Sequence, residues 1–165
     1  MRVFAIVLCV LMLLSGCTTV YDLETISDVY DVQVNSSDRE IVLALPEGAS
    51  QAVLVSDEGD SIYFCDGFSV AVCTLDSGDL SQTIQEITGF EKSSLTVITT
   101  TENGFSRHAF AWTSLGEEVQ QICKGVILDD GYAHYAVTVM CDYTLAADLM
   151  QEINCVLDSV TLRTA

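Results

Sequence analysis

VQQICKGVILDDGYAHYAVTVMC, residues 119–141, is the stretch that decides the fold. Two apolar-rich runs, Val119–Leu128 and Tyr132–Cys141, stand on either side of the turn pair Asp130-Gly131. Apolar residues that alternate on both sides of an Asp-Gly pair predict an antiparallel β-hairpin. The register that a two-residue turn implies pairs Val126 with Tyr135 and Ile122 with Val139.

Further hairpins are predicted on the N-terminal side of this stretch. Asn103-Gly104 is the strongest turn pair in the chain and sets Glu102 opposite Phe105. That register places Arg107 and Thr100 on one face and two apolar pairs on the other, Leu95 with Trp112 and Val97 with Phe110. Turn pairs at Glu58-Gly59 and Asp66-Gly67 predict a three-strand meander near residues 51–57, 60–65 and 68–75.

Two segments have a helical period instead. Asp79 is a predicted N-cap, and Leu80–Gly89 carries an apolar stripe that ends at a glycine. A second amphipathic helix is predicted over Leu145–Leu157, followed by a last strand at Val160–Leu162. The predicted class is therefore α+β, with a single antiparallel sheet of about seven strands built from hairpins and covered by two helices.

The N-terminus indicates export. Arg2 precedes an apolar run, Val3–Leu14, which is the layout of a cleaved secretory signal. Its 12 apolar positions are too few for a membrane span, which needs about 20. Leu14-Ser15-Gly16-Cys17 resembles a lipobox, which implies cleavage between Gly16 and Cys17 and a diacylglyceryl group on the Cys17 thiol.

This resemblance divides the chain into three parts. We expect a lipoprotein signal peptide over residues 1–16, a lipidated cysteine and short tether over 17–28, and one domain over 29–163. The expected location is outside the cytoplasm, on the cell membrane or, in a diderm, the outer membrane. Two acyl chains are needed because one chain gives only marginal, reversible anchoring.

The net charge of the chain limits which classes of molecule the protein can bind. The chain has 24 acidic and 6 basic residues and a formal net charge of −18. Nucleic acid needs a basic footprint and is therefore excluded. Anionic headgroups should repel the domain, so the bilayer is expected to hold it only through the acyl chains on Cys17.

The cysteines predict neither a disulfide framework nor a metal site. Besides Cys9 and Cys17, the five cysteines are Cys65, Cys73, Cys123, Cys141 and Cys155. This odd number leaves at least one free thiol, and the predicted registers bring no two cysteines opposite each other. No Cys-x-x-Cys pair or His/Cys cluster occurs, so we expect no metal or cofactor. Cys155 lies on the polar side of its helix, where we expect another element to cover it.

Acidic clusters and histidines are the remaining candidates for chemistry. The group Asp57, Glu58 and Asp60, like the pair Asp129-Asp130, is expected to be a solvated hairpin tip, because its spacing does not match a calcium loop. His108 should face Thr99 and His134 should face Ile127, both as partly exposed strand residues. Cys123 should share a face with His134 but lie too far away for a Cys-His pair.

We expect the few basic residues and the large aromatic residues to have structural roles. Arg107 and Lys124 are expected to pair with carboxylates. Phe110 and Trp112 are expected in the core.

Several segments together resemble the PsbP-like fold, which occurs in many small bacterial lipoproteins similar to DcrB. The segments are Leu45-Pro46-Glu47-Gly48, Phe110-Ala111-Trp112-Thr113 with Gly116-Glu117, Asp130-Gly131 with Tyr135–Val139, and a terminal helix leading into Val156–Val160. The resemblance covers about Val29 to Leu162. It implies an antiparallel sheet covered by helices and a mostly non-enzymatic accessory or binding role. It supplies no catalytic residues.

The expected function is that of a membrane-anchored surface lipoprotein with a non-enzymatic binding or accessory domain. No catalytic or metal-ligating residue is predicted, and the ligand, a protein or a small molecule, is not identified. One alternative is a cell-surface hydrolase that uses Cys123, Cys73 or a histidine, which requires a concave site with a perturbed thiol or imidazole. The other alternative is a structural envelope component that self-associates.

Overall fold

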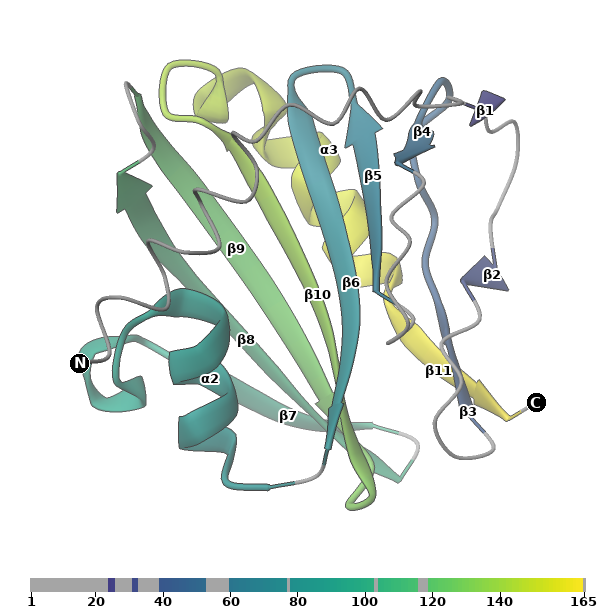
Figure 1. Cartoon of the computed structure of the whole chain (residues 1–165), viewed down its shortest axis with the longest axis vertical. Helices are drawn as coiled ribbons and strands as arrows, with labels where there is room; N and C mark the ends of the chain where they lie inside the picture. Colours follow the sequence, from purple (N-terminus) through teal and green to yellow (C-terminus); the bar gives the residue numbers. More distant parts are fainter. Residues whose placement is uncertain are drawn as a thin grey trace, which may run out of the picture.

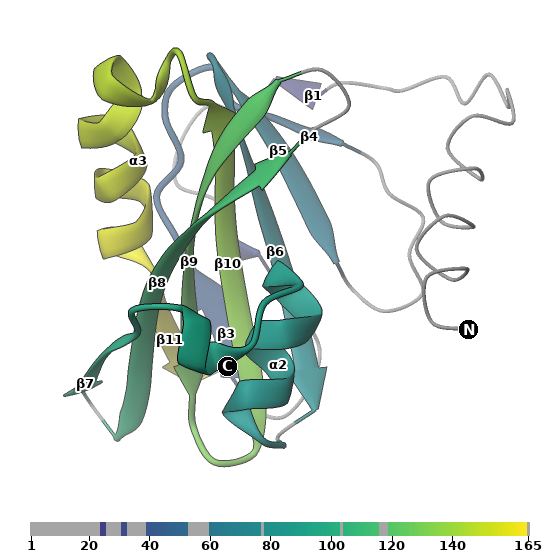
Figure 2. The same ribbon diagram turned by 90° about the vertical axis from the view of Figure 1, so that its left-hand side faces the viewer.

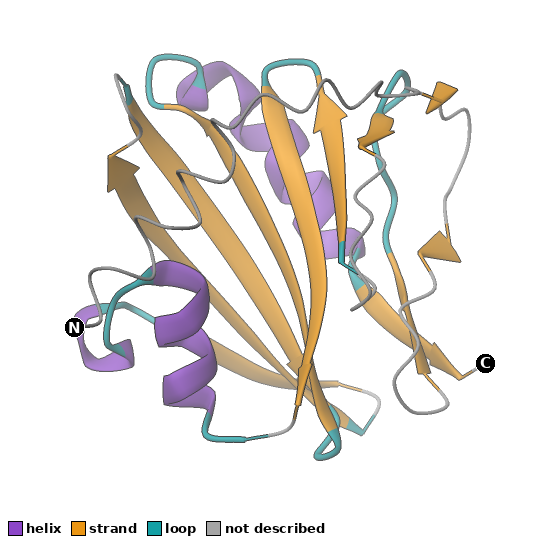
Figure 3. Ribbon diagram, in the orientation of Figure 1, coloured by secondary structure: helices purple, strands orange, loops and turns teal. Residues whose placement is uncertain are grey.

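An eight-stranded antiparallel sheet forms the centre of the molecule. The computed structural model describes residues 24–25, 31–32, 39–52, 60–76, 78–102, 104–115 and 119–164. The strand order, seen in Figures 1 and 3, is β1 (Glu24–Thr25), β4 (Ser50–Ala52), β5 (Ser61–Cys65), β6 (Phe68–Asp76), β10 (Ala133–Asp142), β9 (Gln120–Asp129), β8 (Phe105–Leu115) and β7 (Ile98–Glu102). The α+β class is confirmed.

A smaller sheet lies beside the large one. It has three strands in the order β11 (Thr161–Thr164), β3 (Arg39–Val42) and β2 (Asp31–Val32). The predicted C-terminal strand is thus present as β11, but it pairs with β3 and not with the hairpins of the large sheet.

The two predicted helices cover opposite faces of the large sheet, as Figure 2 shows. They are α2 (Leu80–Thr88) and α3 (Ala146–Ser159), and a short 3₁₀ turn, η1 (Lys92–Ser94), follows α2. The Asp79 side chain accepts the Ser81 N–H, which confirms the N-cap. Gly89 has a φ of 77° and donates its N–H to the Gln85 carbonyl, so it ends α2 as predicted.

Each face of the sheet has its own core because successive strand residues point to opposite sides. On one side, α3 contributes Ile153, Val156 and Leu157 to the larger core. On the other side, Ile84 of α2 packs in a smaller cluster with Phe110, Ile127 and Ala136.

The Asn103-Gly104 hairpin has the predicted register, with Glu102 opposite Phe105 and Thr100 opposite Arg107. The expected pairs of Leu95 and Val97 with β8 are wrong, because β7 begins only at Ile98. These two side chains pack instead against the cluster around Phe110.

The hairpin of residues 119–141 is present, but its register is shifted by two residues. Val126 lies opposite Val137 and not Tyr135, and Ile122 lies opposite Cys141 and not Val139. The cause is a longer turn. The Asp130 carboxylate accepts the N–H groups of Tyr132 and Ala133, and Asp129 accepts that of Gly131. A shift of two keeps every side chain on its predicted face.

The meander is confirmed at Asp66-Gly67, where Cys65 lies opposite Phe68. The Glu58-Gly59 turn lies outside the described residues, as do the signal segment, Cys17 and most of the predicted tether. Glu24–Thr25, inside that predicted tether, pairs with β4. Among the described helices, none has the length and apolar character needed to cross a membrane.

Candidate functional site

A cleft of about 550 Å³ opens between α3 and the part of the sheet formed by β8 and β9. We call it the α3 cleft. Its lining comes from three elements: the segment before and at the start of β7, the strands β8 and β9, and the C-terminal half of α3. The lining residues are Ser94, Leu95, Thr96, Ile98, Arg107, Ala109, Phe110, Ala111, Lys124, Gly125, Val126, Asn154, Leu157 and Asp158.

The floor of the cleft consists of small side chains. Ala109 lies opposite Val126, and Ala111 lies opposite Lys124. Leu95 and Ile98 form an apolar wall, and the Ile98 side chain is 63% exposed. Small residues beside this apolar wall leave an open volume that larger side chains would fill. A cleft of this size and lining is typical of small-molecule sites.

Arg107 stands at one end of the cleft and holds the end of α3. Its guanidinium donates to the carbonyls of Leu157 at 2.6 Å and Val160 at 3.0 Å. The Leu157 carbonyl also accepts the N–H of the C-cap residue Val160. The C-terminal end of a helix carries the negative end of its dipole, so a cation is favourable there. The expectation that Arg107 pairs with a carboxylate is therefore wrong.

Lys124 stands at the other end. Its ammonium donates to the side-chain oxygen of Asn154 and lies 3.8 Å from the sulfur of Met150. Both partners belong to α3, and neither is charged. The carboxylate partner expected for Lys124 is also wrong.

The Lys124 end of the cleft is the more positive one. Among the described residues, no carboxylate lies within 4 Å of Lys124 or Arg107. Asp158 lines the cleft next to Leu157, whose carbonyl accepts from Arg107. The helix end thus offsets Arg107, whereas Lys124 has only neutral partners among the described residues.

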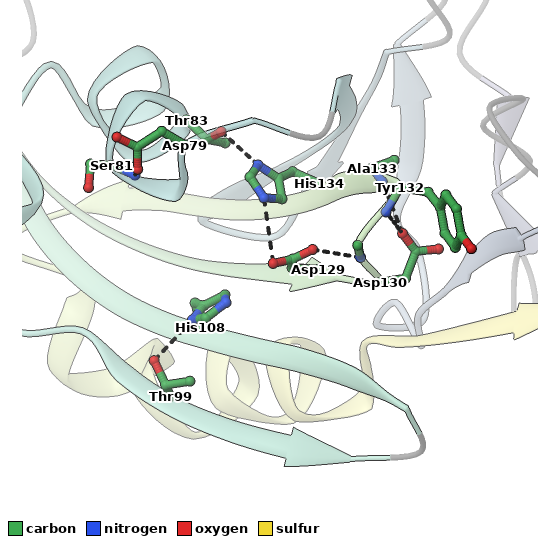
Figure 4. A network of polar contacts seen from close by, with 11 residues as sticks. Asp79, Ser81, Thr83, Thr99, His108, Asp129, Asp130, Tyr132, Ala133 and His134 are labelled. Atoms are coloured by element: carbon green, nitrogen blue, oxygen red, sulfur yellow. Dashed lines mark hydrogen bonds and ion pairs between the residues drawn. The ribbon is translucent and has the colours of Figure 1, made fainter.

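Both histidines are buried, contrary to expectation. His134 is 1% exposed and His108 is 7% exposed. Thr83 of α2 contacts His134, and Thr99 of β7 contacts His108 (Figure 4). These covering segments lie far from the histidines in the sequence, so no local sequence pattern predicts the burial. His108 faces Thr99 as predicted, and its Nδ1 lies 2.9 Å from the Thr99 hydroxyl. His134 faces Asp129 and not Ile127.

The three side chains Thr83, His134 and Asp129 form a hydroxyl–imidazole–carboxylate series. The Thr83 hydroxyl lies 2.7 Å from His134 Nδ1, and His134 Nε2 lies 3.8 Å from the Asp129 carboxylate. Thr83 is 4% exposed, so a substrate cannot reach its hydroxyl in this arrangement. The series ties α2 to β10 and β10 to β9.

His108 has a different environment. Its Nε2 is buried and has no hydrogen-bond partner among the described residues. Burial lowers the pKa of His108, an effect that Asp129 opposes and that Lys92 and His134 increase. These surroundings therefore favour the neutral form of the ring.

Asp130 is not a solvated tip residue. Its side chain is 1% exposed and lies 3.5 Å from the Arg39 guanidinium. It also accepts two backbone N–H groups of its own turn. This carboxylate fixes the turn and ties it to β3. Asp57 and Glu58 of the other acidic cluster lie outside the described residues.

Cys65, Cys73 and Cys123 do not have the properties of nucleophiles. All five that the structure describes carry free thiols. Burial raises the pKa of Cys65, Cys73 and Cys123 to about 11. A reactive thiol requires the opposite shift. Cys155 is exposed on α3, so the expectation that another element covers it is wrong.

Other expected features can be located within the described residues. Phe110 is buried and Trp112 is half-buried, and their rings stack with centroids 5.6 Å apart. No group of three or more His, Cys, Asp or Glu side chains that could hold a metal occurs in that part of the chain.

The sequence interpretation did not identify the α3 cleft or Asn154. One local signal was available: Ala109, Ala111 and Gly125 are small residues at neighbouring positions of two strands. Which helix face lies over them depends on packing between segments far apart in the sequence.

No protein-family model matches the sequence, and a search of curated proteins finds no match. Similar folds occur among solved structures. A Bacteroides thetaiotaomicron protein matches with a TM-score of 0.52 and 9% identity over 74% of this chain, and the chain spans only 45% of that protein.

Two smaller proteins match over almost their whole length. The cyanobacterial PsbP (CyanoP) of Synechocystis sp. PCC 6803 has a TM-score of 0.56 and 10% identity, over 90% of this chain and 96% of that one. The Saccharomyces cerevisiae Ran-binding protein Mog1p has a TM-score of 0.52 and 11% identity, over 83% and 95% of the two chains. Identities this low establish the fold alone. The chain has a PsbP-like α+β fold.

Proposed function

We propose that this protein is a non-catalytic binding domain, anchored outside the cytoplasm by a lipid on Cys17, that holds a small apolar molecule with a carboxylate or similar anionic group in the α3 cleft. One observation carries the proposal: Lys124 lies at the end of the α3 cleft, and its only partners in the described part of the chain are the neutral side chains of Asn154 and Met150. The chain has four acidic residues for every basic one, which makes an ammonium without a carboxylate neighbour unusual here.

Lys124 and Asn154 together provide donors for an anion. The ammonium has three N–H bonds; one goes to the Asn154 oxygen, a second is directed at the Met150 sulfur, and the third is available to an anion. With its oxygen engaged, the Asn154 amide directs two further N–H bonds elsewhere. Hydrogen bonds between an ammonium and a carboxylate are among the stronger ones in proteins.

The apolar walls suit the rest of the ligand. Leu95 and Ile98 offer aliphatic surface that is partly open to solvent. Burial of apolar ligand surface contributes about 25 cal/mol per Å². The raised thiol pKa values and the buried histidines favour binding over catalysis in this proposal.

Titration calorimetry with decanoate and with decan-1-ol tests the ligand class. We expect the wild-type protein to bind decanoate at least tenfold more tightly than the alcohol. Lys124→Met keeps an unbranched side chain only one atom shorter and removes the charge, so it should abolish this preference. Lys92→Met is the matched control, because Lys92 does not line the cleft.

A second variant tests the location. Ile98→Asp places a carboxylate on the exposed apolar wall and should weaken the binding of both probes. Equal decanoate affinity in Lys124→Met and Lys92→Met proteins would contradict the proposal, as would a wild-type protein that binds neither probe.

The anchor is tested separately. The lipobox-like Leu14-Ser15-Gly16-Cys17 supports it, and Cys17→Ser should move the exported protein from the membrane fraction to the soluble fraction. A Cys17→Ser protein that stays in the membrane fraction would show that something other than a lipid on Cys17 holds the protein there.

A further inference from the structure

Strand β8 is longer than the partner on its outer side. It runs from Phe105 to Leu115, whereas β7 pairs only with its residues 105–109. Residues 110–115 therefore pair with β9 alone among the described residues. Figure 1 places the end of this strand at the outer margin of the sheet. An unpaired strand edge can accept an added strand.

The hairpin register shows which backbone groups face outward. The two-residue turn makes Glu102 and Phe105 a hydrogen-bonded pair, and such pairs alternate along an antiparallel ladder. Every second residue from Phe105 thus directs its N–H and C=O toward the β7 side. Beyond β7, these residues are Ala111, Thr113 and Leu115, and all three are exposed.

A groove of about 630 Å³ lies along this edge. One wall is Phe90, Ser94 and Leu95, and the other is formed by Ala111, Trp112 and Thr113 of β8, with Ile122 behind them. Phe90 is 43% exposed. The lining contains no charged residue, and its aromatic side chains offer a place for an apolar side chain.

We propose that the β8 edge from residue 110 to residue 115 binds an extended segment of a partner protein as an added strand, with basic and apolar side chains alternating along that segment. Alternate side chains of a strand point to opposite faces, so one set can enter the groove while the other faces solvent. A chain of net charge −18 attracts a basic segment. The same charge disfavours a second copy of this chain as the occupant. This proposal does not depend on the ligand of the α3 cleft.

The probe is an acetylated and amidated hexapeptide of alternating lysine and valine, and the matched control replaces each valine with proline. Both peptides have the same charge, but the proline peptide lacks the N–H donors that a ladder requires. In 0.15 M salt, we expect the lysine–valine peptide to bind at least tenfold more tightly than the control. Addition of the peptide should shift the amide resonances of Ala111 and Thr113 more than that of Ser114, whose N–H faces β9.

Protein variants test the backbone contact directly. Thr113→Pro removes an outward N–H and leaves the bonds to β9 intact, and it should weaken peptide binding at least tenfold. Thr113→Val keeps the N–H and should bind like the wild type. Should Thr113→Pro fail to fold, Trp112→Ala opens the groove wall and should weaken binding at least fivefold.

Several results would overturn the proposal. These are equal binding of the two peptides, equal binding by the Thr113→Pro and Thr113→Val proteins, and no binding at all. Slow amide exchange at Ala111 and Thr113 in the free protein would show that another part of the chain already occupies the edge. A dimer in sedimentation that Thr113→Pro dissociates would identify a second copy as the occupant.

Discussion

Phe110 occupies the space that a side chain at Gly125 would need on the neighbouring strand. A Cβ atom on Gly125 would lie 2.9 Å from both Cε2 and Cζ of the Phe110 ring. The ring is also stacked on Trp112. The glycine therefore lets the ring lie flat across β9, where it joins the smaller core and borders the α3 cleft.

Gly125→Ala should destabilise the protein by about 1–3 kcal/mol, because the ring must leave its stacked position. Alanine in place of a strand glycine otherwise gains about 0.5–1 kcal/mol, so the sign of the effect is informative. Urea unfolding measures it. In a Phe110→Leu background the alanine methyl group at position 125 has more room, so the loss of unfolding free energy should be smaller. An equal cost in both backgrounds would show that the ring is not the cause.

Thr83→Val should lower the free energy of unfolding by about 1–3 kcal/mol, because it leaves His134 Nδ1 buried without its hydroxyl partner. Thr83→Ser keeps the hydroxyl and should cost less. Hydrogen exchange of the α2 amides provides a second measurement, since the contact ties this helix to β10. Similar stabilities of the valine and serine variants would mean that the hydroxyl contributes nothing.

His108 should make the protein less stable in mild acid. Its pKa in the folded protein is lowered from 6.5, so below about pH 6.5 the unfolded chain binds a proton that the native state does not. The stabilising contribution is complete above this pH and declines as the pH falls toward the folded pKa. Unfolding free energies at pH 7.5 and 5.5 should therefore differ less in His108→Gln than in the wild type. An unchanged difference would assign the pH dependence to other groups.

The elements and faces of this fold follow from local patterns. Turn pairs at residues 66–67 and 103–104 set their hairpin registers correctly, because a two-residue turn fixes the pairing of its flanking residues. At Asp130-Gly131 the same rule misplaces the register by two residues, because the two aspartate side chains accept backbone N–H groups and lengthen the turn. The faces remain correct, since a strand repeats every two residues.

The features that were missed depend on contacts between distant segments. Nothing near His134 in the sequence shows that Thr83 will cover it, and Asp130 is buried by Arg39 from another sheet. The partners of Arg107 were missed because helix-end carbonyls carry no charge in a residue count. The α3 cleft arises where a helix leaves small strand residues uncovered, which is a property of packing and not of either segment alone.

Arg107→Lys should destabilise the protein by about 1–2 kcal/mol, although it conserves the charge. The guanidinium reaches the carbonyls of Leu157 and Val160 with two separate nitrogens, and an ammonium is a compact point charge that cannot reproduce this fork. Thermal unfolding measures the loss, and hydrogen exchange should locate it at the C-terminal end of α3.

Arg163→Lys is the matched control, because Arg163 pairs with Glu40 at 3.0 Å while its side chain is 52% exposed. Exposed ion pairs contribute about 0–1 kcal/mol and tolerate this exchange. Equal losses in the two variants would mean that Arg107 acts only as a charge. A larger loss at Arg107, with faster exchange at the end of α3, would show that the helix is held over the sheet by these two hydrogen bonds, and that the Arg107 end of the cleft depends on them.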